Sequence, residues 1–249
     1  MPGLVPRATG HSVDAGSPPS AHSAWAAVSD IADVVVPRAR TRAEFIEECR
    51  SGDFDGATVA FRTFDSVSVT GKVDAELVGA LPASLRFICH NGAGYDQIDV
   101  LACSARNIRV SNTPTAVDDA TADINMFLIL GTLRNLSVAI SSLRRGEWRG
   151  KTPPALGHDP QGKVLGILGM GGIGRNLAKK ARAFGMTIRY HNRSRLCEST
   201  ERECAAEFVS FERLLAGSDV LSLNLPLNVR ARPPLSPGRP AADEATREA

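Results

Sequence analysis

The chain lacks the features that mark metal proteins, secreted proteins and membrane proteins. Its five cysteines form no C-x-x-C pair and no metal-ligand spacing, so reduced thiols are expected and no metal site is predicted. It contains no run of about 18 apolar residues and no apolar signal segment near its first residues, which excludes an evident membrane span or secretory leader. A cytoplasmic protein is therefore predicted.

An excess of charge of one sign is also lacking. The sequence has 29 basic and 27 acidic residues, a net charge of +2, and its basic residues are scattered rather than interleaved with aromatic ones. Neither nucleic acid nor an anionic membrane surface is therefore an expected partner. A hydrophobic content of 43% and a charged content of 22% are typical of a globular protein, and 249 residues suffice for two ordinary domains.

A strand, a glycine-rich turn and a helix follow one another in the second half of the chain. The apolar run 163–168 leads directly into G-x-G-x-x-G, and an amphipathic helix is expected over 175–184. In this order Gly169 permits a tight turn, Gly171 lets a pyrophosphate approach the backbone, and Gly174 lets the helix pack closely on the strand. A turn without a ligand is the alternative, but the flanking strand and helix favour a dinucleotide site. The predicted contacts are Gly169, Gly171, Gly172, Ile173 and Gly174.

The end of the next strand, expected over 186–191, bears on which dinucleotide binds. A site for NAD places a carboxylate at this end to bond the ribose hydroxyls, but no acid occurs here before Glu198. Arg193 and Arg195 would instead attract a 2′-phosphate, and Ser194 could donate a hydrogen bond to it. NADP is therefore favoured, with NAD or a merely solvated basic turn as alternatives. The predicted contacts are Asn192, Arg193 and Ser194.

Helices and strands alternate at short spacing along the chain, which predicts an α/β protein with parallel sheets. Strands are expected at 32–36, 57–61, 85–89, 108–111, 163–168, 186–191, 208–209 and 219–224. Helices are expected at 22–29, 41–50, 74–81, 99–105, 117–145, 175–184 and 211–216. Residues 1–20 and 229–249 are rich in Gly, Pro, Ala and Ser or in charge and are predicted to be disordered.

Several motifs together resemble the D-isomer-specific 2-hydroxyacid dehydrogenases, most closely their glyoxylate/hydroxypyruvate reductase branch of fungal type. They are N-G-A-G-Y-D-Q-I-D at 91–99, N-I-R-V-S-N-T-P at 107–114, the glycine turn, Y-H-N-R-S at 190–194 and L-N-L-P-L-N at 223–228. The resemblance covers about residues 21–228, and the combination is more specific than any single motif.

The resemblance implies a flavodoxin-like substrate domain over 21–112, with its first strand missing, and a partial Rossmann domain over 113–228. It implies NAD(P)H-dependent reduction of a small 2-oxo acid, such as glyoxylate or hydroxypyruvate, at a cleft between the domains. By resemblance, the substrate carboxylate would be held by the loop of Asn91, Gly92, Ala93 and Gly94, whose alternative is an ordinary tight turn. The coenzyme would also meet Thr121, Leu225 and Pro226, whose alternatives are a helix-surface threonine and strand-end packing.

The sequence departs from the family beyond residue 228. There the family carries its catalytic arginine, acid and histidine, and residues 229–249 supply none of them. His90 lies nearest to the substrate loop, but a histidine at a strand end is more often structural. The chain is therefore predicted to be an incomplete or mis-spliced reductase without activity, the alternative being a truncated nucleotide-binding protein. Intact relatives form homodimers, for which the helix 117–145 is a candidate, although an internal core face explains its apolar residues equally well.

Overall fold

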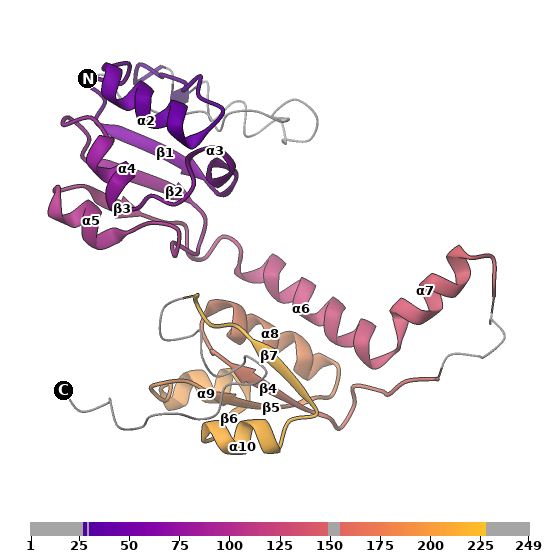
Figure 1. The fold of residues 1–249 in the computed structure, drawn as a ribbon. Coiled ribbons are helices and arrows are strands. Elements are labelled where there is room, and N and C mark those ends of the chain that lie inside the picture. The colour runs from indigo at the N-terminus through magenta and orange to yellow at the C-terminus, as the bar shows by residue number, and fades with distance from the viewer. Residues whose placement is uncertain (1–26, 29, 149–154, 228–249) are drawn as a thin grey trace. The chain divides into compact units, whose positions relative to one another are not determined.

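The protein is described by a computed structural model, which covers residues 27–28, 30–148 and 155–227 (Figure 1). The chain divides into two compact units, residues 1–114 and residues 115–249. The disorder predicted for 1–20 and 229–249 falls outside the described residues, as does most of the helix predicted at 22–29, of which residues 27 and 28 are helical.

The first unit is built on a three-stranded parallel sheet in the order β1-β2-β3. The strands are β1 (Val59–Thr63), β2 (Phe87–Asn91) and β3 (Arg109–Ser111). The helices are α2 (Arg42–Ser51), α3 (Val67–Thr70), α4 (Ala75–Ala80) and α5 (Val100–Ala105), with a 3-10 turn η1 (Phe64–Ser66). The buried core of this unit includes Leu77, Leu85, Ile88 and Cys103.

Three helices of the first unit begin where the sequence offers a capping side chain. Thr41, Asp74 and Asp99 each accept a hydrogen bond from the amide three residues on, at 3.3, 3.1 and 2.9 Å. Such N-caps satisfy a backbone donor that the helix itself leaves unpaired. At α2 the Glu44 carboxylate accepts from the amide of Arg40 at 2.8 Å, so it caps the residue before Thr41.

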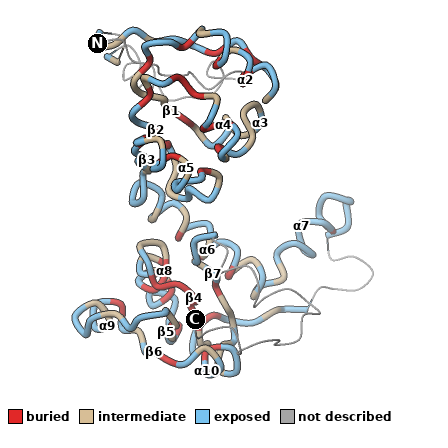
Figure 2. The backbone as a smooth tube through the Cα atoms, turned by 60° about the vertical axis from the view of Figure 1, so that its left-hand side comes forward, coloured by how far each residue is buried: buried red, intermediate tan, exposed pale blue. Residues whose placement is uncertain are grey.

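The second unit contains a four-stranded parallel sheet in the order β6-β5-β4-β7. The strands are β4 (Val164–Leu168), β5 (Thr187–His191), β6 (Ala206–Phe208) and β7 (Val220–Leu223). The helices are α6 (Asp118–Leu133), α7 (Leu136–Arg144), α8 (Gly172–Ala183), α9 (Glu198–Cys204) and α10 (Phe211–Ala216). In chain order this arrangement is 3-2-1-4, the first four strands of a doubly wound sheet, which confirms the predicted fold class. Buried residues gather on β4 and its neighbours (Figure 2).

The strand predicted at 32–36 is wrong, because these residues follow an irregular path. Val35 and Val36 are 40% and 43% exposed. A β-strand exists only where a neighbouring strand accepts its hydrogen bonds, and within the described residues the edge strand β1 pairs with β2 alone. Apolar, β-branched composition therefore predicted a strand for which the described part of the chain offers no partner.

The single helix predicted at 117–145 is also wrong, since it breaks into α6 and α7 with a bend of 77°. Asn135, at the break, has a left-handed backbone with φ of +53°. Its side-chain amide donates to the carbonyl of Ala155 at 3.1 Å, and the amide of His158 donates to the carbonyl of Leu133 at 2.7 Å. The segment that returns toward β4 thus satisfies the end of α6. None of the described helices could span a membrane alone, and α6 and α7 meet that length and composition only when counted together.

Candidate functional site

The glycine turn after β4 has a geometry that side chains would block. Gly169 has φ of +100°, and a Cβ there would lie 2.7 Å from the carbonyl oxygen of Asn224. At Gly174 a Cβ would lie 2.5 Å from the carbonyl oxygen of Gly169, so α8 packs directly on the end of β4. At Gly171 nothing lies within 4 Å of an added Cβ. The turn therefore leaves open space at its middle glycine and is closed at the other two.

Helix α8 begins immediately after this open position. Its N-cap, Gly171, has no side chain, and the first amides of a helix, here around Gly172 and Ile173, lack partners within the helix. These amides and the positive end of the helix dipole are suited to an anion. The carboxylate of Asp118 on α6 lies close to the Cα of Gly172, because a Cβ added there would collide with its Oδ2. No local pattern predicts this contact, because it depends on how α6 packs against α8.

The end of β5 is tied to the glycine turn by two hydrogen bonds. The amide of Gly169 donates to the carbonyl of His191 at 3.1 Å, and the amide of Met170 donates to Oδ1 of Asn192 at 2.7 Å. Asn192 therefore holds the turn in place. Arg193 and Ser194 follow it on the surface, and no described residue forms an ion pair with the Arg193 guanidinium.

Arg195, expected to attract a phosphate, has a protein partner instead. Its Nε and one terminal nitrogen donate to the two carboxylate oxygens of Glu201 at 2.9 and 2.8 Å. The buried Tyr190 donates its hydroxyl proton to Glu201 at 2.6 Å and accepts from the amide of Leu196 at 3.0 Å. Hydrogen bonds from Arg195 and Tyr190 lower the pKa of Glu201 to about 2, so the carboxylate stays ionised. Arg193 is thus the guanidinium left available at this strand end.

The remaining predicted coenzyme contacts also lie in the second unit. Thr121 lies on α6, one turn after its start, and is half-buried, whereas Leu225 and Pro226 follow β7 and are exposed. Asn125 on α6 donates a side-chain hydrogen bond to Asn224, at the end of β7, at 3.2 Å. The structure therefore gathers the glycine turn and the ends of β5 and β7 at the carboxyl edge of the sheet, where doubly wound folds bind ligands.

The predicted substrate loop lies in the first unit. Asn91 ends β2, and Gly92, Ala93 and Gly94 form the loop that follows it. The loop is anchored by a hydrogen bond from the amide of Thr113 to the carbonyl of Gly92 at 2.9 Å. No acceptor within the described residues is bonded to the amides of Ala93 and Gly94, so these two donors are available to an anion.

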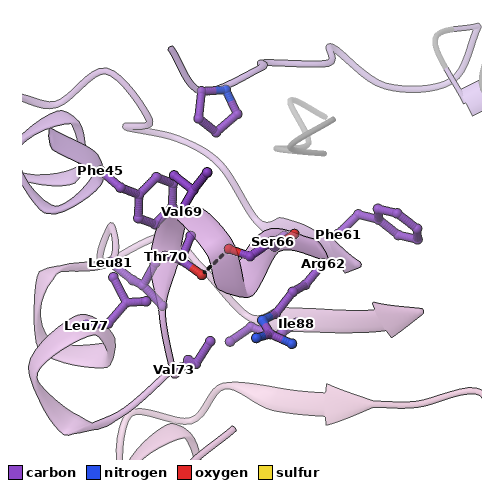
Figure 3. A pocket seen from close by; sticks show the side chains of 12 residues that line it. Phe45, Phe61, Arg62, Ser66, Val69, Thr70, Val73, Leu77, Leu81 and Ile88 are labelled. Carbon is purple, nitrogen blue, oxygen red and sulfur yellow. Dashed lines mark hydrogen bonds between the residues drawn. The ribbon is translucent and has the colours of Figure 1, made fainter. Parts of the chain in front are cut away.

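The first unit also contains an apolar cavity that the sequence did not predict (Figure 3). Its volume is about 60 Å³, and Phe45 on α2 and Leu77 on α4 line it opposite β1 and β2. The buried Arg62 on β1 is the charged residue in its lining, and no described residue pairs with its Nε. Nothing predicted as a coenzyme or substrate contact lines this cavity.

The two histidines at strand ends are both engaged with the protein. Nε2 of His90 lies 2.9 Å from the carbonyl of Gly94, and Nδ1 of His191 lies 2.9 Å from the carbonyl of Val209. Across the described residues, no three histidine, cysteine, aspartate or glutamate side chains are grouped as metal ligands would be. All five cysteines are free.

Comparison with known proteins finds relatives along most of the chain. Residues 126–236 match the family model of the D-isomer specific 2-hydroxyacid dehydrogenase NAD binding domain. The chain is 54% identical over 212 residues to 4-methyl-2-oxopentanoate reductase A of Aspergillus oryzae, which covers 85% of this chain and 63% of that protein. It is 43% identical over 212 residues to glyoxylate reductase 1 of Saccharomyces cerevisiae, covering 82% of this chain and 60% of that protein.

A solved structure gives the same result. The crystal structure of a glyoxylate reductase from Paecilomyes thermophila matches with a TM-score of 0.81 and 48% identity, covering 92% of this chain and 67% of that chain. The chain spans less than two thirds of the length of the curated relatives described above. Similarity of this extent, on a doubly wound unit with its glycine turn at the sheet edge, means that the chain belongs to the D-isomer specific 2-hydroxyacid dehydrogenase family, in the branch of the fungal glyoxylate reductases.

Proposed function

We propose that the second unit binds NADP(H) in preference to NAD(H). The pyrophosphate would lie against Gly171, Gly172 and Ile173 at the start of α8, and the 2′-phosphate against Arg193 and Ser194. The observation that carries this proposal is the guanidinium of Arg193 after the end of β5, which has no ion-pair partner among the described residues and lies next to a turn that is open at its middle glycine. A guanidinium and a hydroxyl attract a phosphate, whereas the carboxylate of Glu201, which follows this strand end on α9, is neutralised by Arg195.

Titration calorimetry of the purified chain with NADPH and with NADH tests this preference. Replacing Arg193 by glutamine should lower the affinity for NADPH by ~10- to 100-fold, since a charge-assisted hydrogen bond is lost, and should leave NADH unchanged. Arg202→Gln is the matched control, because Arg202 pairs with Glu198 on the exposed side of α9. Absence of heat with both coenzymes, or equal NADPH binding by both variants, would contradict the proposal.

We also propose that the whole protein reduces a small 2-oxo acid, such as glyoxylate or hydroxypyruvate, to the 2-hydroxy acid in the cytoplasm. The coenzyme would supply the hydride, and the protein would supply binding and orientation. The free amides of Ala93 and Gly94 in the loop after β2 support a site for the carboxylate of that acid. The names of the fungal relatives, a 4-methyl-2-oxopentanoate reductase and glyoxylate reductases, support this substrate class.

We further infer that residues 1–249 on their own bind coenzyme without turnover. The support is that His90 and His191, the histidines at the described strand ends, already bond to backbone carbonyls. An assay that follows NADPH oxidation with glyoxylate and with hydroxypyruvate tests this inference. NADPH binding without oxidation would favour a truncated nucleotide-binding protein, and robust turnover would contradict the inference.

Finally, we propose that the protein forms a homodimer through α6 and α7. One face of α6 packs into the core through Ala122, Met126 and Ile129. The opposite face exposes Ile124, Phe127 and Leu128, which are 58%, 60% and 57% exposed and lie at helical spacing. The internal core thus accounts for one face of this helix, and a second copy of the chain would cover the other.

A further inference from the structure

The backbone carbonyls of the loop 91–94 are held from within the first unit. The carbonyl of Gly92 accepts from the amide of Thr113 at 2.9 Å, and that of Ala93 accepts from the side-chain amide of Asn112 at 2.8 Å. Fixing a carbonyl fixes its whole peptide plane, including the amide of the next residue. These two contacts therefore set the directions of the two amides that follow, those of Ala93 and Gly94.

The third carbonyl of the loop, that of Gly94, lies 2.9 Å from Nε2 of His90. His90 is 3% exposed and sits directly beneath the loop, since a Cβ added to Gly92 would lie 2.6 Å from Nε2. A carbonyl oxygen accepts but cannot donate, so Nε2 carries the proton. The imidazole thus acts as the donor that orients the Gly94 peptide.

The other ring nitrogen of His90 faces Arg62 on β1, the residue that lies opposite His90 in the pairing of β1 with β2. One terminal nitrogen of Arg62 lies 3.3 Å from Nδ1 of His90, and the other donates to Oε1 of Gln97 at 3.1 Å. A guanidinium only donates, so this contact is a hydrogen bond when Nδ1 accepts, in the neutral tautomer of His90 that is protonated at Nε2. Burial, and then the charge of Arg62, lower the pKa of His90, while hydrogen bonds to the backbone of Gly94 and Arg62, and then the charge of Asp96, oppose the shift.

We propose that His90, oriented by Arg62, is a positioning residue: it holds the Gly94–Tyr95 peptide and so supports the loop whose Ala93 and Gly94 amides would bind the carboxylate of the 2-oxo acid. This inference rests on the proposed function, since it assigns a substrate anion to the loop. It extends that function by naming a donor chain, Arg62 to His90 to the Gly94 carbonyl, which touches neither substrate nor coenzyme. Its effect is on binding of the acid, not on binding of the coenzyme.

Protonation of His90 should break this chain. An imidazolium has no acceptor at Nδ1, so it would face the Arg62 guanidinium with two donors and two like charges. The pKa of the imidazole is already below its ordinary value, so the loss belongs to pH values below about 6.5. The affinity for the acid should therefore fall as the pH is lowered through and below that region, while the affinity for NADPH should not follow the same curve.

The test uses the full chain with NADPH present and oxamate, an unreactive 2-oxo acid analogue, as the probe. His90→Leu should weaken oxamate binding by at least ~10-fold, because the Gly94 carbonyl loses its donor. His90→Gln retains an amide donor, so its affinity for oxamate should stay within ~3-fold of that of the original chain. Because glutamine does not titrate, this affinity should not fall at low pH. Ser84→Ala is the control, because it removes a half-buried hydrogen bond from a side chain to a backbone carbonyl, that of Ala57, at the opposite end of the same sheet.

The outcomes separate this inference from the proposed function. The positioning role would be supported by three results together: oxamate binding is lost in the leucine variant, kept in the glutamine variant and unaffected by Ser84→Ala. This holds even where the leucine variant is less stable. Normal oxamate binding by the leucine variant, or a glutamine variant that keeps the pH dependence, would overturn the positioning role alone. Failure of the original chain to bind oxamate while binding NADPH would overturn the substrate assignment and this role with it.

Discussion

Glu201 controls how much positive charge the end of β5 offers to a coenzyme. Its carboxylate receives two hydrogen bonds from Arg195 and one from Tyr190, and its own side chain is 10% exposed. Arg193, two residues before Arg195, has no such partner among the described residues. Of these two arginines, Arg195 is therefore neutralised, and Arg193 has no ion-pair partner in the described part of the chain.

Replacing Glu201 by glutamine should release the charge of Arg195 to the same phosphate. We expect NADPH to bind ~3- to 10-fold more tightly, a gain of the size that one partly solvated charge supplies, while NADH is unaffected. Fluorescence titration with both coenzymes measures the effect. Glu198→Gln, on the exposed side of the same helix, is the control and should change neither affinity by more than ~2-fold. A loss of NADPH affinity in the Glu201 variant would mean that the bound Arg195 fixes the shape of the turn instead.

This residue-level detail could not be predicted from the sequence. The basic character of Arg193 and Arg195 is evident, but the partner of Arg195 lies six residues further along, on a helix that the sequence did not predict. The same holds for His90, whose place beside the substrate loop is evident while its link to Arg62 depends on β1 lying next to β2. Local patterns identify residue types, whereas their pairing depends on strands that are distant in the chain.

At the scale of elements, β4, the glycine turn and α8 form the part of the fold that the sequence predicted best. The apolar run becomes a buried strand and the amphipathic segment becomes a helix whose Leu177, Ala178 and Ala181 are buried. Both patterns are local periodicities of apolar residues, so they can be recognised without knowledge of the tertiary fold. Gly174 joins them, because the missing side chain sets how closely α8 approaches the strand.

Gly174→Ala should therefore push α8 away from β4. The added Cβ would meet the Gly169 carbonyl at 2.5 Å, and we expect a loss of ~1–3 kcal/mol in the free energy of unfolding, as for an overpacked core. Weaker binding of both coenzymes should accompany it, because the start of α8 moves. Gly79→Ala in α4 is a matched control with nothing within 4 Å of its Cβ, and should be neutral or stabilising by ~0.5–1 kcal/mol. Urea unfolding compares the two, and equal stability changes would refute the packing role.

The two incorrect predictions of secondary structure have a common physical cause. The apolar residues 32–36 have strand composition, yet a strand needs an edge to pair with. The helix after residue 117 has no proline to stop it, yet it ends at Leu133 because residues 155–158 fold back and bond to its last turn. In both cases a contact between distant segments decides the outcome, and propensity does not contain that information.

At the scale of the whole molecule, the described surface carries two apolar areas that single exposed side chains do not explain. One is the stripe of Ile124, Phe127 and Leu128 on α6, and the neighbouring α7 also exposes Val138 and Leu143, which are 50% and 57% exposed. The other lies along β7 and the residues after it, where Leu223, Leu225 and Leu227 are 51%, 41% and 54% exposed. Large apolar side chains exposed along one helix face or one strand are typical of an interface or a site of aggregation.

The α6–α7 stripe predicts a dimer that one charge should disrupt. Placing a carboxylate at Phe127 removes an aromatic anchor and would bury an unpaired charge, so Phe127→Glu should weaken self-association by at least ~100-fold. Leu101→Glu is the control, because Leu101 is 84% exposed on α5 in the other unit and belongs to neither apolar area. Sedimentation equilibrium should show a dimer for the original chain and for the control, and a monomer for the Phe127 variant.

A dimer that persists in the Phe127 variant would place the interface elsewhere. Species larger than a dimer would instead indicate association through β7, which is an edge strand of the described sheet, because an open strand edge can add further copies without closing.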